Sequence, residues 1–197
     1  MELLIIALVG GVMVRYSYQI YKGQVNPALS TWVIFFLGGF LSFLTYLSAS
    51  GETDFEGGIF NMVDMVGDLA VIFSVLLWAE NPRVRMEPFE KKYLSAAGTL
   101  ALFWLVSGNA FVSNLLIQLL IMVGYVPTIV KIIKRKKNTE SFSSWGPYLA
   151  AGLIAGYIAF GSGDILAAAY AIKSIVMVSI VLAVMIFYEI KERVKNS

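Results

Sequence analysis

The stretch VMVRYSYQI at Val12–Ile20 returns later in the chain as IMVGYVPTI at Ile121–Ile129. Each copy is followed by a second matching block, NPALSTW over residues 26–32 and TESFSSW over residues 139–145. Two blocks in the same order indicate an internal repeat, and a repeat decides how the whole fold is read. The identical positions are Met13 with Met122, Val14 with Val123, Tyr16 with Tyr125, Ile20 with Ile129, Ser30 with Ser143 and Trp32 with Trp145.

Composition places this repeat in lipid. Of the 197 residues 58% are hydrophobic and only 14% are charged, whereas an ordinary soluble domain is about 25% charged. A soluble core of this size cannot hide so much apolar surface, so we expect an all-α integral membrane protein rather than a soluble enzyme, a disordered chain or a secreted disulfide scaffold. The apolar stretches predict seven transmembrane helices, over residues 2–21, 31–49, 58–79, 93–108, 110–133, 144–160 and 165–188.

The residue types that are missing narrow the chemistry. The chain has no Cys and no His, which removes thiolate nucleophiles, the commonest metal ligand and the usual proton carrier near neutral pH. No Gly-rich phosphate loop, metal cluster or nucleophile–base pair is visible in the sequence. We therefore expect no enzymatic activity, no metal, no cofactor and no nucleic-acid partner.

The basic residues predict the orientation. Twelve Lys and Arg residues fall in alternate connecting segments and the tail, and the remaining segments hold acidic residues with no Lys or Arg. Basic loops stay in the cytoplasm, so we expect the N-terminus outside, the C-terminus inside and a multi-pass protein of the plasma or inner membrane. The twelve are Lys22, Arg83, Arg85, Lys91, Lys92, Lys134, Arg135, Lys136, Lys137, Lys191, Arg193 and Lys195.

The repeat and the spans together predict a 3+1+3 arrangement. Three helices in residues 1–79 match three in residues 110–197, and the segment 80–109 supplies a cytoplasmic loop and one linker helix. A single linker helix makes both three-helix units point the same way, so the repeat is parallel.

The loop of the second copy carries a family resemblance. Pro127-Thr128-Ile129 ends the fifth span, the basic run Lys134–Lys137 follows, and Trp145 opens the sixth. This resembles the PQ-loop motif of the SWEET, SemiSWEET and PQ-loop transporter superfamily, and in the first copy Gln19 keeps the Gln of that motif. The resemblance implies a membrane transporter with seven helices. It also implies hinge or gating roles for Pro127, Pro147 and Gln19, although the prolines are present only in the second repeat. We expect Trp32 and Trp145 to be interfacial anchors.

Polar side chains inside the spans predict the site. Asn61, Asp64 and Asp68 stand at i, i+3 and i+7 and share one face of the third span, while Lys173 lies at comparable depth in the seventh. Charges at mid-bilayer normally face a cavity or each other. We expect Asp68 and Lys173 to face each other across the two repeats and to line a solute path with Asp64 and Asn61. Asn114 and Gln118, four residues apart in the fifth span, either line that cavity or hydrogen-bond to a neighbouring helix.

These features favour a transporter that moves a small polar solute, sugar or amino-acid-like, by alternating access between the two three-helix bundles. Asp64 and Asp68 are the candidate proton carriers, because the chain lacks His. A second class is a retinal photoreceptor with Lys173 as the Schiff base, and a third is a vitamin channel or sorting receptor on the same fold. The sequence leaves open the substrate, the coupling and whether the chain forms a homo-oligomer.

Overall fold

The computed structural model describes residues 1–25, 29–50, 55–79, 88–138 and 140–196. Part of the first repeat motif (residues 26–28), the acidic segment 51–54, the basic positions Arg83 and Arg85 and the repeat residue Thr139 lie outside the described residues. The helices are α1 (Glu2–Tyr21), α2 (Leu29–Ser50), α3 (Phe55–Trp78), α4 (Pro88–Ser107), α5 (Ala110–Gly124), α6 (Val126–Arg135), α7 (Phe142–Ser162) and α8 (Ile165–Asn196).

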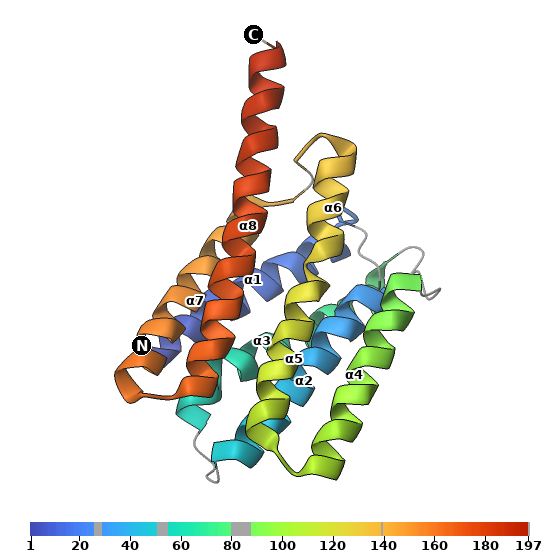
Figure 1. Cartoon of the computed structure of the whole chain (residues 1–197). Coiled ribbons are helices and arrows are strands. Elements are labelled where there is room, and N and C mark those ends of the chain that lie inside the picture. The colour runs from blue at the N-terminus through green and yellow to red at the C-terminus, as the bar shows by residue number, and fades with distance from the viewer. Residues whose placement is uncertain (26–28, 51–54, 80–87, 139, 197) are drawn as a thin grey trace.

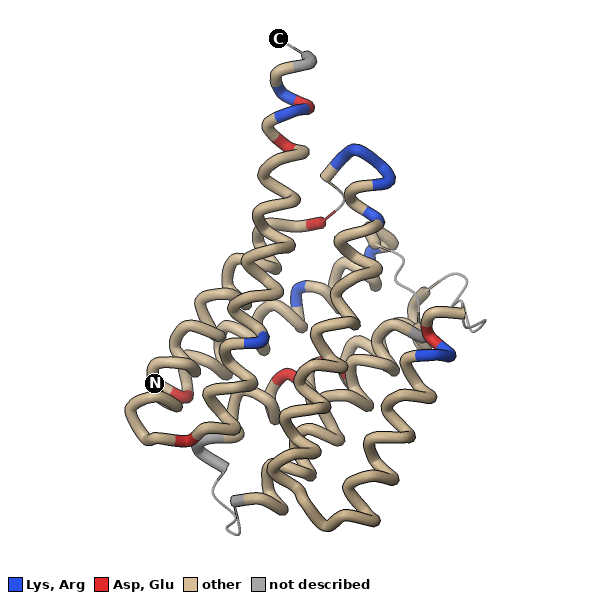
Figure 2. The backbone as a smooth tube through the Cα atoms, in the orientation of Figure 1, with Lys and Arg blue, Asp and Glu red and all other residues tan. Residues whose placement is uncertain are grey.

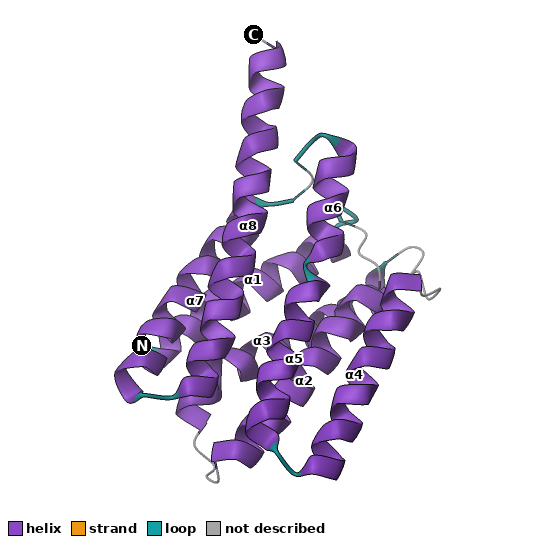
Figure 3. Cartoon of the chain, in the orientation of Figure 1, coloured by secondary structure: helices purple, strands orange, loops and turns teal. Residues whose placement is uncertain are grey.

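Throughout these ranges the protein is helical and contains no strand (Figure 3). Five helical stretches are long and apolar enough to cross a membrane, and they lie in α1, in α2, in α3, in the stretch Ala110–Arg135 and in α8. The predicted fourth and sixth segments are helical and form α4 and α7, which have 20 and 21 residues. Neither is among the five stretches that are long and apolar enough to cross a membrane.

The predicted helix over residues 110–133 is interrupted at one residue. Tyr125 separates α5 from α6, and its N–H bonds to Met122 O at 3.2 Å in a tightened turn. Pro127 follows in the first turn of α6, where a missing N–H costs little because the first N–H groups of a helix have no intrahelical partner. Proline thus explains why one predicted helix becomes two segments.

The last helix is longer than predicted. α8 runs to Asn196 rather than residue 188. Charged residues sustain the added turns, because Arg193 pairs with Glu189 at 3.5 Å one turn away and Lys137 reaches Glu192 at 3.3 Å. In Figure 2 this tail and the basic end of α6 stand at the same end of the molecule.

We term α1, α2 and α3 the first bundle and α5 to α8 the second bundle. In the first bundle α3 packs between α1 and α2, and in the second α8 packs against both α7 and α5. Between the bundles, α1 packs on α7 and α2 packs on α5, so the first helix of each bundle meets the second helix of the other (Figure 1). α4 lies against α5 and α2, outside both bundles.

Close helix approach depends on small residues at defined points. A side chain at Gly67 of α3 would meet Met13 of α1, whose Cγ lies 2.5 Å from the position of an added Cβ. A side chain at Gly124 would meet Phe35 of α2 at 2.9 Å. Gly67 thus allows close packing of α3 on α1 within the first bundle, and Gly124 allows close packing of α5 on α2 between the bundles.

Candidate functional site

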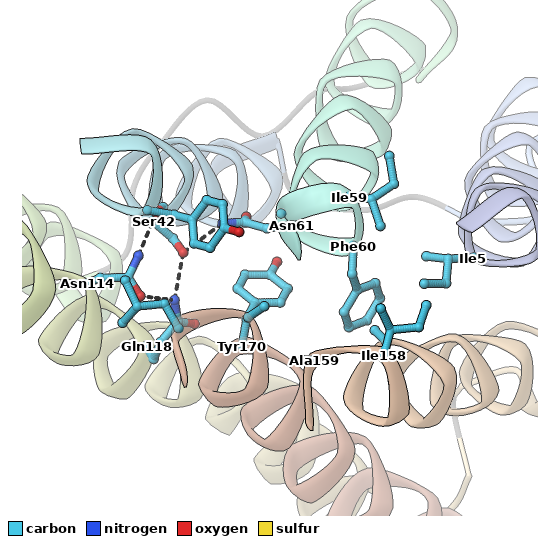
Figure 4. Close-up of a pocket in the computed structure, with 15 residues that line it drawn as sticks. Ile5, Ser42, Ile59, Phe60, Asn61, Asn114, Gln118, Ile158, Ala159 and Tyr170 are labelled. Carbon is cyan, nitrogen blue, oxygen red and sulfur yellow. Dashed lines mark hydrogen bonds between the residues drawn. The ribbon is translucent and has the colours of Figure 1, made fainter. Parts of the chain in front are cut away.

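Polar side chains from three helices form a hydrogen-bonded group in the interior, which we term the amide cluster: Ser42 and Thr45 of α2, Asn61 of α3, and Asn114 and Gln118 of α5. Asn114 Nδ2 donates to Ser42 O at 2.6 Å and to Thr45 Oγ1 at 2.9 Å. Gln118 Nε2 donates to Ser42 Oγ at 2.6 Å and to Asn114 Oδ1 at 3.1 Å (Figure 4). The cluster therefore joins α2 of the first bundle to α5 of the second.

Ser42 decides how the Asn61 amide is oriented. Its hydroxyl accepts from Gln118, so it is best used as a donor toward Asn61. With the amide oxygen on that side, Asn61 accepts from Ser42 Oγ at 2.8 Å and from the Phe43 N–H at 3.1 Å, and its NH₂ group donates to Gly39 O at 3.2 Å.

A cavity of about 10 Å³ adjoins the amide cluster. Asn61, Asn114, Gln118 and Tyr170 are among the residues that line it (Figure 4). Gln118 Oε1 is buried and has no hydrogen-bond partner in the described structure. A cavity of this size holds about one water molecule, so the interior is closed around an unsatisfied acceptor.

The polar face of α3 that we expected is turned toward the interior. The groups that bond to its Asp64 carboxylate come from the second bundle. Asp64 Oδ2 accepts hydrogen bonds from Tyr148 Oη of α7 at 2.6 Å and from Tyr170 Oη of α8 at 2.7 Å. The ring of Phe60 lies 5.5 Å from each tyrosine ring, between centroids. Sequence reasoning did not find these tyrosines, because an aromatic residue in an apolar span does not reveal which helix it will meet.

Lys173 is buried, but the structure does not show the arrangement expected for it. Its side chain is 3% exposed, and Nζ lies 3.6 Å from the centroid of the Tyr170 ring, three residues earlier on α8. Nζ has no hydrogen-bond partner, and the salt bridges found among the described residues do not join it to Asp68. The two residues share the interior without a direct ion pair, because the face of Tyr170 covers the ammonium group.

At one end of the molecule, a hydrogen bond connects the two bundles and closes the interior. Tyr46 Oη, near the end of α2, donates to Asp164 Oδ2 at 2.6 Å. Asp164 lies in the α7–α8 turn, where its Oδ1 also accepts from the Ala167 N–H at 2.9 Å and caps α8. One carboxylate thus fixes both the start of α8 and the contact with α2.

At the opposite end of the molecule, a row of aromatic side chains closes the interior. In tilted or edge-to-face contacts, Tyr16 packs on Trp32 at 5.1 Å, Trp32 on Phe35 at 6.3 Å, Phe35 on Tyr125 at 5.6 Å and Tyr125 on Trp145 at 6.1 Å, between centroids. We call these five residues the aromatic chain. Trp32 and Trp145, which we expected to be interfacial anchors, are half-buried and pack against the apolar core.

The predicted hinge residues do not lie at one place. Pro127 is exposed in the first turn of α6, Pro147 is half-buried inside α7, and Gln19 is half-buried near the end of α1. Of these, Pro127 adjoins the one interrupted helix, and Tyr125 at that interruption belongs to the aromatic chain.

The site offers hydrogen-bond donors and acceptors, two carboxylates and an ammonium group, all held by interior packing. In the described ranges no group of three His, Cys, Asp or Glu residues is placed to hold a metal ion. The residues lining the small cavity do not include Lys173. Comparison with protein-family models, with curated proteins and with solved structures finds no match to this chain.

Proposed function

We propose that this protein is a membrane transporter for a small polar solute and that it works by alternating access between the two bundles. The observation that carries the proposal is the group of buried polar side chains where the bundles meet. It includes Asn61 and Asp68 of the first bundle and Asn114, Gln118 and Lys173 of the second. Polar groups are costly in a membrane interior and mark solute paths there, and transporters built from repeats bind their solutes at the repeat interface.

The two closures support the mechanism. The Tyr46–Asp164 hydrogen bond and the aromatic chain each connect the two bundles, and they lie at opposite ends of α2 and α7. With both closures formed and a cavity of about 10 Å³ between them, this is an occluded state. Rocking one bundle on the other would break one closure while keeping the second, so that the amide cluster meets water from one side at a time.

We further propose that all seven segments cross the membrane, with the N-terminus outside and the C-terminus in the cytoplasm. The proposal rests on the twelve Lys and Arg residues of one set of segments and on the matching order of helices in the two bundles. With it go the parallel 3+1+3 repeat, a multi-pass place in the cell membrane and the resemblance to SWEET and PQ-loop transporters.

Orientation can be tested directly, because the chain has no native Cys. Single Cys substitutions at Ser50 and Asn138 are labelled on intact cells with a reagent that does not cross membranes. We expect labelling at position 50 only. Labelling at 138 with protection at 50 would reverse the orientation, and labelling at both would remove the odd number of spans between them.

Solute binding can be tested with purified protein in a thermal-shift screen against sugars, amino acids and nucleosides. We expect at least one class to raise the melting temperature of the wild type. Gln118→Leu removes an amide of the cluster and should abolish that shift, whereas Leu119→Ala, at an exposed position on the same helix, should retain it. Uptake of the identified solute into proteoliposomes then measures transport. A solute that binds but is never taken up would contradict the proposal.

A further inference from the structure

The two aspartates of α3 have different partners. Asp64 Oδ2 takes two hydroxyl hydrogens at 2.6 and 2.7 Å, from Tyr148 and Tyr170. Asp68 lies one turn further along the same helix and is 5% exposed. Within the described part of the chain no hydrogen bond or salt bridge reaches its carboxyl group. One carboxyl group thus has fixed donors and the other has none.

The charges in this interior do not balance if both aspartates are ionised. Lys173 supplies the one buried ammonium group among the described residues, and it is paired with neither aspartate. Two like charges one helical turn apart disfavour each other, and each charge at mid-bilayer costs about 2.5–3.5 kcal/mol on insertion scales. One proton on the pair would leave a single negative charge, on Asp64, opposite the single positive charge of Lys173.

The polar groups near Asp68 on the surrounding helices are tyrosine side chains and the ammonium group of Lys173. Five residues interact electrostatically with Asp68: Tyr93 of α4, Tyr125 between α5 and α6, Tyr170 and Lys173 of α8, and Asp64 on its own helix. From α7, Tyr148 is bonded to Asp64. The neighbouring contacts with α1 and α2 are uncharged: Met13 lies against Gly67, and Gly39 lies against Met65.

The Tyr93 hydroxyl is a further polar group near Asp68 that lacks a hydrogen-bond partner. Its side chain is 3% exposed, and its hydroxyl has no hydrogen-bond partner in the described structure. A hydroxyl can donate to an ionised carboxylate or accept from a protonated one. α4 therefore brings to Asp68 a group that suits either protonation state, and it does so from outside both bundles.

We propose that Asp68 is a proton-binding site, and that Asp64 is the fixed negative charge that accompanies Lys173. A proton from water on one side forms an O–H bond with the Asp68 carboxylate, and the same bond breaks when the site opens to water on the other side. No other bond changes and no further reactant is required. The use of this proton to drive solute movement rests on the proposed transport function, whereas proton uptake by Asp68 is a property of the protein alone.

The test is infrared spectroscopy of the purified protein while the pH is stepped across the neutral range, in which exposed carboxylates stay ionised. The probe is the C=O band of a protonated carboxylic acid. We expect the wild type to show such a band, with an amplitude that follows pH. Asp68→Asn should remove the band. The matched variant Asp64→Asn should still show it, but only at lower pH than the wild type, because the neighbouring negative charge that disfavours ionisation of Asp68 is gone.

The variant Asp68→Glu is the control for loss of folding. Glu retains a carboxyl group, so the band should return at a shifted frequency, and circular dichroism checks that each variant is helical. Absence of the band from the wild type, or its removal by Asp64→Asn but not by Asp68→Asn, would overturn the proposal. These results do not depend on finding a solute, so a titrating Asp68 band in a protein that transports nothing would support the proton site and contradict the proposed transport.

Discussion

Removing the two tyrosine hydroxyls that hold Asp64 tests the contact between the bundles. Tyr148→Phe and Tyr170→Phe each delete one hydroxyl and preserve the ring. Hydrogen bonds to charged groups contribute about 1.5–3 kcal/mol, whereas bonds between helices in membranes average about 0.6 kcal/mol. At 2.6 and 2.7 Å these bonds have the length of charge-assisted ones, so the larger range applies. Because the second hydroxyl remains in each single variant, we expect each to lose about 1.5 kcal/mol.

The double variant should lose more than the sum. It removes the last donor and leaves a carboxylate without a partner in the interior, which typically costs about 3–5 kcal/mol. The two single losses sum to about 3 kcal/mol, so we expect a positive coupling energy of up to about 2 kcal/mol between the two positions. Unfolding in mixed micelles, titrated with SDS and followed by tryptophan fluorescence, measures these free energies. Tyr157→Phe, at a tyrosine of α7 that is 70% exposed, is the matched control. Additive or sub-additive losses would refute the shared role of the two hydroxyls.

Three further predictions follow from individual contacts. Tyr46→Phe breaks the bond to Asp164 and should weaken the closure by about 1–2 kcal/mol. In the Tyr46→Phe variant, a Cys introduced at position 47 should react faster with a thiol reagent than the same Cys beside Tyr46. An unchanged rate would exclude a closing role for the bond to Asp164. Gly67→Ala forces a Cβ into Met13 and should destabilise the protein by about 1–3 kcal/mol in the same unfolding assay, and wild-type stability would mean that Met13 repacks freely. Pro127→Ala, at an exposed position in the first turn of α6, should change stability by less than about 0.5 kcal/mol. If the α5–α6 interruption is a hinge, solute uptake should slow in that variant, whereas unchanged uptake leaves Pro127 as a terminator of α5.

The sequence predicted what depends on local pattern. Hydropathy located the helical segments, and the i, i+3, i+7 spacing placed Asn61, Asp64 and Asp68 on one face of a helix that does turn inward. The amides of Asn114 and Gln118 were expected either to bond between helices or to line a cavity, and they do both.

The sequence could not predict what depends on how helices rotate against one another. Opposite charge and equal depth suggested that Asp68 and Lys173 would face each other, but the tyrosine three residues before Lys173 lies under its ammonium group instead. Tyr148 and Tyr170 gave no sign of their carboxylate partner, since a hydroxyl inside an apolar span can be satisfied from any side. The length of α8 was underestimated because its charged turns read as a solvated tail.

That long last helix has a practical consequence. α8 has 32 residues, which at 1.5 Å per residue make a rod of about 48 Å, whereas the hydrocarbon layer is about 30 Å thick. A rod of this length that crosses the layer once leaves roughly a third of its length outside it. The salt bridge of Glu192 to Lys137 ties this projection to the connection between α6 and α7, so it should follow the second bundle as a lever. A fluorophore or an antibody fragment fixed to it would magnify a small tilt of that bundle into a displacement large enough to measure in single molecules.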